Sequence, residues 1–292
     1  MKRMHIKKLS WLRLSVLLGS FAFLYLPMLI LVIYSFNDSR LVTVWGGWSV
    51  RWYSELFRDD MLMQAVGLSL FIAVCAASAA VMLGTASAFV LARFGRFSGM
   101  NGFAFMNSAP LVMPEVITGL SLLLLFVAMG EVFGWPQNRG TTTIWIAHVT
   151  LCTAYVTVVV CARLREFDKT LEEAAMDLGA RPLKVFFVIT LPLIAPAIAA
   201  GWLLAFTLSL DDLVIASFVS GPNASTLPMV VFGSVRQGVN PKFNALATIF
   251  IAIVSAAAFL GWLFVAQRDK RDAQARAMMK KREAEARQAA LP

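Results

Sequence analysis

Three carboxylates lie inside stretches of the chain that are otherwise apolar. Glu115 follows a proline in the run APLVMPEVITGLSLLLLF, and Asp211 and Asp212 are adjacent in the run GWLLAFTLSLDDLVIASFVSGP. A charge at the centre of a bilayer costs about 2.5–3.5 kcal/mol on insertion scales. We therefore do not expect packing alone to account for the adjacent pair Asp211 and Asp212. The chemistry that they suggest is the lining of a polar pathway at membrane depth.

Each acid also has a simpler interpretation, which the sequence leaves open. Pro110 and Pro114 each remove a backbone donor, so the helix should break or bend there. Glu115 then either lines an aqueous cavity, where irregular backbone is tolerated, or lies near the headgroups on a kinked packing helix. Asp211 and Asp212 point about 100° apart around a helix. One of them can face a pathway while the other holds a neighbouring helix, or both can cap a helix end near the interface.

The composition indicates the elements that must position these residues. The chain has 292 residues, of which 59% are hydrophobic and 15% charged, and its mean hydropathy is +0.72. A span of ~30 Å of hydrocarbon needs about 20 residues. Six apolar runs are long enough: 14–36, 65–92, 103–129, 141–162, 192–219 and 243–266. The sequence thus predicts an all-α, polytopic membrane protein with six transmembrane helices.

Two of these runs carry further signals. The second is dense in Ala, Gly and Ser, which allow helices to approach closely and predict a position inside a bundle. The fourth contains His148. We expect this histidine to be hydrogen-bonded to a neighbouring helix rather than to act in catalysis.

The distribution of Lys and Arg predicts the orientation in the membrane. Of the 26 basic residues, 20 lie in the two end segments and in the loops 93–102 and 163–191. Positive loops favour the cytoplasmic side, so both termini and the 163–191 loop are expected there. The net charge of +9 is then a topological bias and does not indicate nucleic-acid binding. We expect three parts: a cytoplasmic segment 1–13, a six-helix membrane domain 14–266, and a basic cytoplasmic tail 267–292 beside membrane lipid.

The 163–191 loop is the most polar segment in the middle of the chain. Thr170 and Glu173 have the spacing of a capping box at a helix start. A single helix face is expected to carry Leu171, Ala174, Ala175 and Leu178. Gly179 suits the left-handed residue that ends a helix, Pro182 suits the first position of a second helix, and Pro192 would end or redirect that helix. A short helix with a small apolar face, held outside the membrane, is suited to docking.

The same residues resemble the EAA signature of ABC-importer permeases. The matching positions are Glu173, Ala174, Ala175, Gly179, Ile189, Leu191 and Pro192. The resemblance implies that this segment is a coupling helix, which inserts into a groove on a cytoplasmic ATPase. It also implies the six-helix fold of such permeases.

A second resemblance, covering about 65 to 260, is to polyamine-importing permeases for putrescine or spermidine. It rests on SLDDLVIASFVSGP from Ser209, on TLPMVVFGSVRQGVNP and NALATI further on, and on the run around Glu115. The resemblance implies a second permease, two ATPase subunits that bind ATP and Mg, and a periplasmic polyamine-binding protein. An ammonium is costly to desolvate unless carboxylates and carbonyl dipoles replace its water. Glu115, Asp211 and Asp212 are the candidates for that role.

Several classes of function are excluded or disfavoured. The chain has no G-x-x-x-x-G-K-[ST], H-E-x-x-H or G-x-S-x-G motif and no paired C-x-x-C, so we expect no enzymatic activity, cofactor or metal in it. The prediction is a permease subunit in the bacterial inner membrane that carries a polyamine, with putrescine preferred. The alternatives are an ABC permease for another small cationic or polar solute, or an ion-coupled secondary transporter, which would usually show internal repeats.

Overall fold

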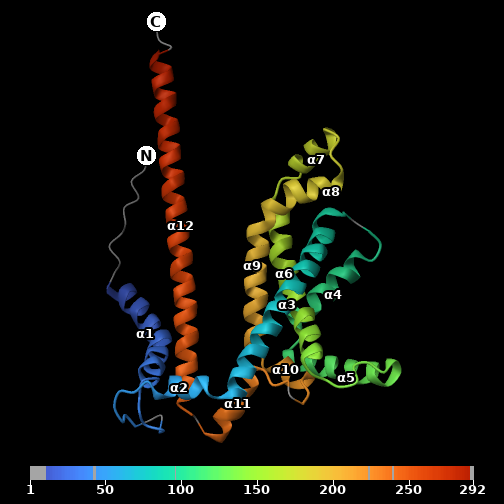
Figure 1. Ribbon diagram of the computed structural model, residues 1–292. Coiled ribbons are helices and arrows are strands. Elements are labelled where there is room, and N and C mark those ends of the chain that lie inside the picture. Colours follow the sequence, from blue (N-terminus) through green and yellow to red (C-terminus); the bar gives the residue numbers. More distant parts are fainter. Residues whose placement is uncertain (1–10, 42–43, 96, 223, 239, 290–292) are drawn as a thin grey trace. The chain divides into compact units, whose positions relative to one another are not determined.

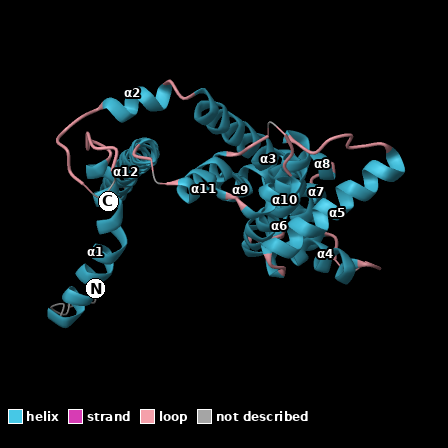
Figure 2. Cartoon of the chain, turned by 90° about the horizontal axis from the view of Figure 1, so that it is seen from below, coloured by secondary structure: helices cyan, strands magenta, loops and turns pink. Residues whose placement is uncertain are grey.

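The computed structural model describes residues 11–41, 44–95, 97–222, 224–238 and 240–289 (Figure 1). These residues are helices joined by loops, and apart from one isolated bridge between Asn37 and Trp48 they contain no strand (Figure 2). The elements are α1 (Trp11–Tyr34), α2 (Arg51–Phe57), α3 (Asp60–Arg93), α4 (Met100–Val112), α5 (Glu115–Phe133), α6 (Thr141–Glu166), α7 (Thr170–Asp177), α8 (Pro182–Val185), the π-helix η1 (Phe186–Thr190), α9 (Leu191–Asp211), α10 (Val214–Val219), α11 (Leu227–Gln237) and α12 (Lys242–Ala289). The chain divides into two compact units, residues 59–238 and residues 1–58 with 239–292.

The prediction of six membrane-crossing helices is confirmed by length and apolar composition. The six candidate spans are Arg13–Tyr34, Asp60–Arg93, Glu115–Phe133, Thr141–Glu166, Pro182–Asp211 and Lys242–Gln267. The third and fifth differ most from the sequence prediction. Each contains an irregularity that apolar composition alone does not locate.

The core of the 59–238 unit is formed by α3, α6 and α9, which pack along one another. Small side chains of α3 are buried there: Ala73, Ala76, Ala77, Ala80, Gly84 and Ala88. A Cβ on Gly84 would lie 2.7 Å from Cγ1 of Val156 and 3.1 Å from the carbonyl oxygen of Thr153, both on α6. Close helix approach therefore depends on these small residues, as the sequence predicted.

The third predicted span, 103–129, is two helices rather than one. α4 continues through Pro110 and ends before Met113, whose backbone is extended with φ −75° and ψ 135°. Pro114 disfavours helical geometry in the residue before it, which explains why the break lies there. α5 begins immediately afterwards at Glu115. The interruption predicted at Pro114 is confirmed, but the helix does not break at Pro110, and the membrane span begins at Glu115 instead of residue 103.

The fifth span begins earlier and ends earlier than predicted. α8, η1 and α9 follow one another without a loop, and the helix changes direction between α8 and α9 (Figure 1). Pro192 is at the start of α9, immediately after the wide π-helical turn. A π-helical turn tolerates the loss of the backbone hydrogen bond that proline cannot donate. Pro192 therefore lies where the helix changes direction, and the helix continues past it. Helical geometry stops at Asp211, because Asp212 is extended with φ −65° and ψ 122°.

The second unit contains α1, α2 and α12, in which α12 packs against both α1 and α2. The loop before α2 is organised by Asn37, which is 1% exposed. Its side-chain amide donates to the carbonyl of Val44 at 2.7 Å, and its Oδ1 accepts from the amide of Gly46 at 2.7 Å. The indole of Trp52 donates to the Asn37 carbonyl at 2.6 Å. A single buried amide thus orders the connection from α1 to α2.

Candidate functional site

The start of α7 differs from the predicted capping box. Lys169 is the N-cap residue, and its own side chain makes no capping hydrogen bond. Thr170 is already the first helical residue, and its amide donates to Oδ1 of Asp168 at 3.0 Å. The prediction that Thr170 and Glu173 cap each other is wrong, because Asp168 takes the amide at this end and shifts the helix start by one residue.

The end of α7 is as predicted. Gly179 has φ +85°, a left-handed conformation that favours glycine. Its amide donates to the carbonyl of Met176 at 2.8 Å, and the amide of Ala180 donates to the carbonyl of Ala175 at 3.0 Å. Pro182 then occupies the start of α8. These bonds satisfy the last carbonyls of the helix and fix the turn between α7 and α8.

The face of α7 and α8 that is available for docking is apolar and exposed. Leu178 is 90% exposed and Leu183 is 74% exposed. Of the remaining predicted coupling residues, Glu173, Ala174 and Pro192 are exposed, whereas Ala175, Ile189 and Leu191 are half-buried. Leu183 belongs to the start of the fifth candidate span, whereas Leu178 and Leu171, which is 52% exposed, lie outside every span. Exposed apolar side chains outside a span are typical of a surface that contacts another protein.

Glu172, next to the predicted Glu173, was not identified from the sequence. Its Oε1 accepts from Thr190 Oγ1 at 2.8 Å and from Arg93 Nη2 at 3.3 Å. Its Oε2 lies 2.9 Å from Arg93 Nε. The geometry does not meet that of a hydrogen bond, so the two atoms form an ion pair only. The Arg93 and Glu172 side chains are only 8% and 12% exposed. They join the last turn of α3 to the first turn of α7.

Asp211 and Asp212 have different surroundings, because α9 ends at Asp211 and Asp212 has an extended backbone; the expected separation by 100° around one helix does not apply. Asp211 is the last residue of α9 and is exposed, whereas Asp212 is 8% exposed. The Asp212 carboxylate accepts from the amide of Ile215 at 3.3 Å and from that of Ala216 at 2.7 Å. It therefore caps the N-terminus of α10, which corresponds to the capping interpretation for this residue.

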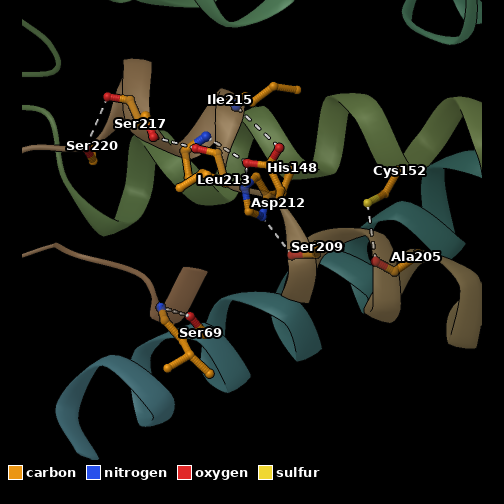
Figure 3. Close-up of polar contacts among 12 residues, drawn as sticks. Ser69, His148, Cys152, Ala205, Ser209, Asp212, Leu213, Ile215, Ser217 and Ser220 are labelled. Carbon is orange, nitrogen blue, oxygen red and sulfur yellow. Dashed lines mark hydrogen bonds and ion pairs between the residues drawn. The ribbon is translucent and has the colours of Figure 1, made fainter. Parts of the chain in front are cut away.

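His148 completes a buried network with Asp212 and Ser209 (Figure 3). Its Nε2 lies 3.1 Å from Oδ2 of Asp212, and its Nδ1 lies 2.7 Å from Oγ of Ser209. Because a carboxylate only accepts, Nε2 donates to Asp212; a neutral imidazole would then accept from the Ser209 hydroxyl at Nδ1. The expected bond from His148 to a neighbouring helix is confirmed, since Ser209 belongs to α9.

This Ser–His–Asp arrangement is the constellation that hydrolases use. Here Ser209 is 5% exposed and His148 is 1% exposed, so a substrate has no direct access to the hydroxyl. The carboxylate is also committed to two backbone amides. The network holds α6, α9 and α10 together, and its geometry does not indicate catalysis.

The far end of α10 is also attached to α6 and the loop before it. Oγ1 of Thr143 donates to the carbonyl of Val219 at 2.7 Å, and Arg139 donates to the carbonyl of Phe218 at 3.2 Å. Gly221 lies so close that a Cβ there would overlap the carbonyl of Arg139. α10 is therefore fixed at both ends.

Glu115 is exposed in the first turn of α5. α5 packs on α10, where a Cβ on Gly119 would lie 3.3 Å from the Cα of Ile215. Glu115 and Gly119 are four residues apart and share a helix face. The structure thus places Glu115 on the helix that packs against α10, and Asp212 two residues before α10 begins, but no contact joins Glu115 to either aspartate among the described residues.

Comparisons with known proteins match these features. The family described as binding-protein-dependent transport system inner membrane component matches residues 80–272. The putrescine transport system permease protein PotI of Escherichia coli K12 is 67% identical over 270 residues, which cover 92% of this chain and 96% of the relative. The spermidine/putrescine transport system permease protein PotC of Haemophilus influenzae is 42% identical over 253 residues, with coverages of 87% and 96%. A bacterial ABC transporter involved in the import of alginate shares the fold, with a TM-score of 0.64 at 17% identity, covering 85% of this chain and 93% of that chain.

Proposed function

Because the chain belongs to the family of binding-protein-dependent transport system inner membrane components, we propose that it is the permease subunit of an ATP-driven importer of putrescine. It is a multi-pass protein of the inner membrane, with six helices long and apolar enough to cross it. The observation that supports putrescine as the substrate is the 67% identity to a putrescine permease across nearly the whole length of both chains.

The proposed assembly contains a second permease, two ATPase subunits and a periplasmic polyamine-binding protein. The support within this chain is the exposed apolar side chains of Leu171 and Leu178, which flank the EAA residues Glu173, Ala174 and Ala175 of α7. The ATPases bind ATP and Mg and pull the coupling segment, while this chain performs no bond chemistry and binds no cofactor.

The proposed orientation has both termini and the 163–191 loop in the cytoplasm. It is supported by the 20 of 26 basic residues that fall on that side. The six helices between 14 and 266 form the permease domain in this proposal, preceded by the segment 1–13 and followed by the basic tail 267–292. The α7–α8 segment then lies on the same side as the ATPases.

Asp211 and Glu115 are the proposed acids of the substrate pathway. Both are exposed within the single chain, so no side chain of this chain covers them. Asp212 was predicted to belong to the same set. Its contacts with His148 and two backbone amides favour a structural role, in which it orders the segment beside Asp211.

The test of the pathway is Asp211→Asn, which keeps the shape and removes the charge. Loss of one charge-assisted hydrogen bond, worth about 1.5–3 kcal/mol, is expected to lower putrescine uptake roughly ten- to hundred-fold. The ATPases should still co-purify with the chain. Glu131→Gln, at an exposed carboxylate near the other end of α5, is the matched control and should transport normally. If Asp211→Asn and Glu115→Gln both transport putrescine normally, these acids do not serve the pathway.

A further inference from the structure

The attachment of α7 to the membrane helices is uneven. α7 packs mainly against α8 and η1, its neighbours in sequence. Between α7, α8 and the end of α3 lies a cavity of about 470 Å³, lined by residues that include Phe89, Met176 and Phe186. Apolar packing from α7 onto α3 is therefore incomplete, and the Arg93–Glu172 pair bridges this space.

Three contacts hold that bridge in place. The guanidinium contacts both carboxylate oxygens, at 2.9 Å and 3.3 Å, and Thr190 of η1 holds Oε1 at 2.8 Å. The Nη2–Oε1 contact is a hydrogen bond, and the Nε–Oε2 contact adds charge attraction at short distance. Because both side chains are nearly buried, water screens the pair little. A displacement of α7 would thus carry Arg93 with it.

α3 connects the Arg93–Glu172 bridge to the core of the 59–238 unit. Arg93 is the last residue of α3, and α3 packs along both α6 and α9. α9 leads to Asp211, and α6 carries the His148 network. Movement delivered to the end of α3 therefore reaches α9, whose last residue is the proposed pathway acid Asp211.

We propose that Arg93, Glu172 and Thr190 form a brace that transmits displacement of the coupling segment to α3 during transport. This inference rests on the proposed function, since it requires ATPases that move α7. The three are positioning residues. They touch neither substrate nor nucleotide, and they act by holding α7, η1 and α3 in a fixed position relative to one another. Glu173, next to Glu172, is exposed and remains available to the ATPase.

The test compares uptake with basal ATP hydrolysis in the complete reconstituted complex. In Glu172→Gln, uptake is expected to fall at least about ten-fold, as for the loss of one buried charged contact. Basal hydrolysis should stay within about two-fold, because the docking face of α7 is intact. Coupling between sites is reciprocal, so stimulation of hydrolysis by the loaded binding protein should fall together with uptake.

Two further variants distinguish loss of the brace from a general loss of folding. Thr190→Val removes one hydroxyl at nearly constant volume and is expected to lower uptake per ATP hydrolysed by less than Glu172→Gln does. The exchange Arg93→Glu with Glu172→Arg keeps opposite charges across the cavity and is expected to recover part of the uptake. The matched control is Glu166→Gln, which breaks an exposed pair with Arg163 at 3.4 Å and should leave uptake per ATP unchanged.

Several outcomes would overturn the brace. One is normal uptake in Glu172→Gln. A second is a fall in basal ATP hydrolysis in proportion to the fall in uptake, and a third is loss of the ATPases from the complex. In either case the Arg93–Glu172 pair would support docking of the ATPases and not transmission. Normal uptake per ATP in Thr190→Val together with no recovery in the exchanged pair would also exclude it. Failure of the unchanged complex to take up putrescine with ATP would instead contradict the proposed function.

Discussion

Replacement of Asp212 by alanine is expected to destabilise the 59–238 unit much more than replacement of its neighbour Asp211. The change removes the acceptor for the amides of Ile215 and Ala216 and for Nε2 of His148. Loss of an N-cap costs about 0.5–2 kcal/mol. A buried donor without a partner, here the imidazole, costs about 1–3 kcal/mol more. The expected total is therefore about 1.5–5 kcal/mol.

The assay is thermal unfolding of the purified chain in detergent. For a unit of this size each kcal/mol shifts the midpoint by roughly 2–4 °C, so Asp212→Ala should lower it by at least about 3 °C. Asp211→Ala is the matched control, because an exposed substitution usually changes stability by no more than about 0.5 kcal/mol.

A double-mutant cycle with His148→Ala identifies the cause. If the two side chains stabilise each other, the double variant should be less destabilised than the sum of the single variants, by about 0.5–3 kcal/mol. Equal midpoints for Asp211→Ala and Asp212→Ala, or strict additivity in the cycle, would refute the assignment of Asp212 as the residue that ties α10 to α6.

The remaining predictions concern coupling, packing and sidedness. Gly179→Val should reduce uptake while membrane insertion survives, because φ +85° strains a β-branched residue; normal ATP-driven uptake would exclude a fixed turn after α7. Gly221→Ala should reduce the yield of folded protein, since a Cβ would overlap a backbone carbonyl, whereas Gly233→Ala, with nothing within 4 Å, should be tolerated; equal yields would contradict the close approach. A reporter active only in the periplasm should be silent when fused after Arg268 and active near Gly47, and the reverse pattern would invert the proposed topology.

The features that the sequence predicted correctly depend on local backbone chemistry. The stop at Gly179, the helix start at Pro182 and the break before Pro114 each follow from one residue and its immediate neighbours. Apolar run length likewise predicts the number of spans, because the bilayer thickness sets the requirement. The capping box at Thr170 failed because Asp168, two residues earlier, competes for the same amide.

The contacts that the sequence did not predict join residues far apart in the chain. Arg93 and Glu172 are 79 residues apart, and His148 and Asp212 are 64 apart. No periodicity in a single sequence indicates which buried charges meet, since that depends on how α3, α6 and α9 pack. Two adjacent acids in the run from 192 to 219 indicated that their roles should differ. Only the break of α9 separates Asp212, as a cap, from the exposed Asp211.

The most direct test of the proposed function is uptake of labelled putrescine into proteoliposomes. They would contain this chain, its partner permease and the ATPase subunits, with ATP inside and the binding protein outside. We expect saturable uptake that requires ATP and is suppressed by unlabelled putrescine but not by 1,4-butanediol, which has the same carbon chain without the ammonium charges. Uptake driven by an ion gradient without ATP, or equal competition by the diol, would contradict an ATP-driven permease for a diammonium substrate.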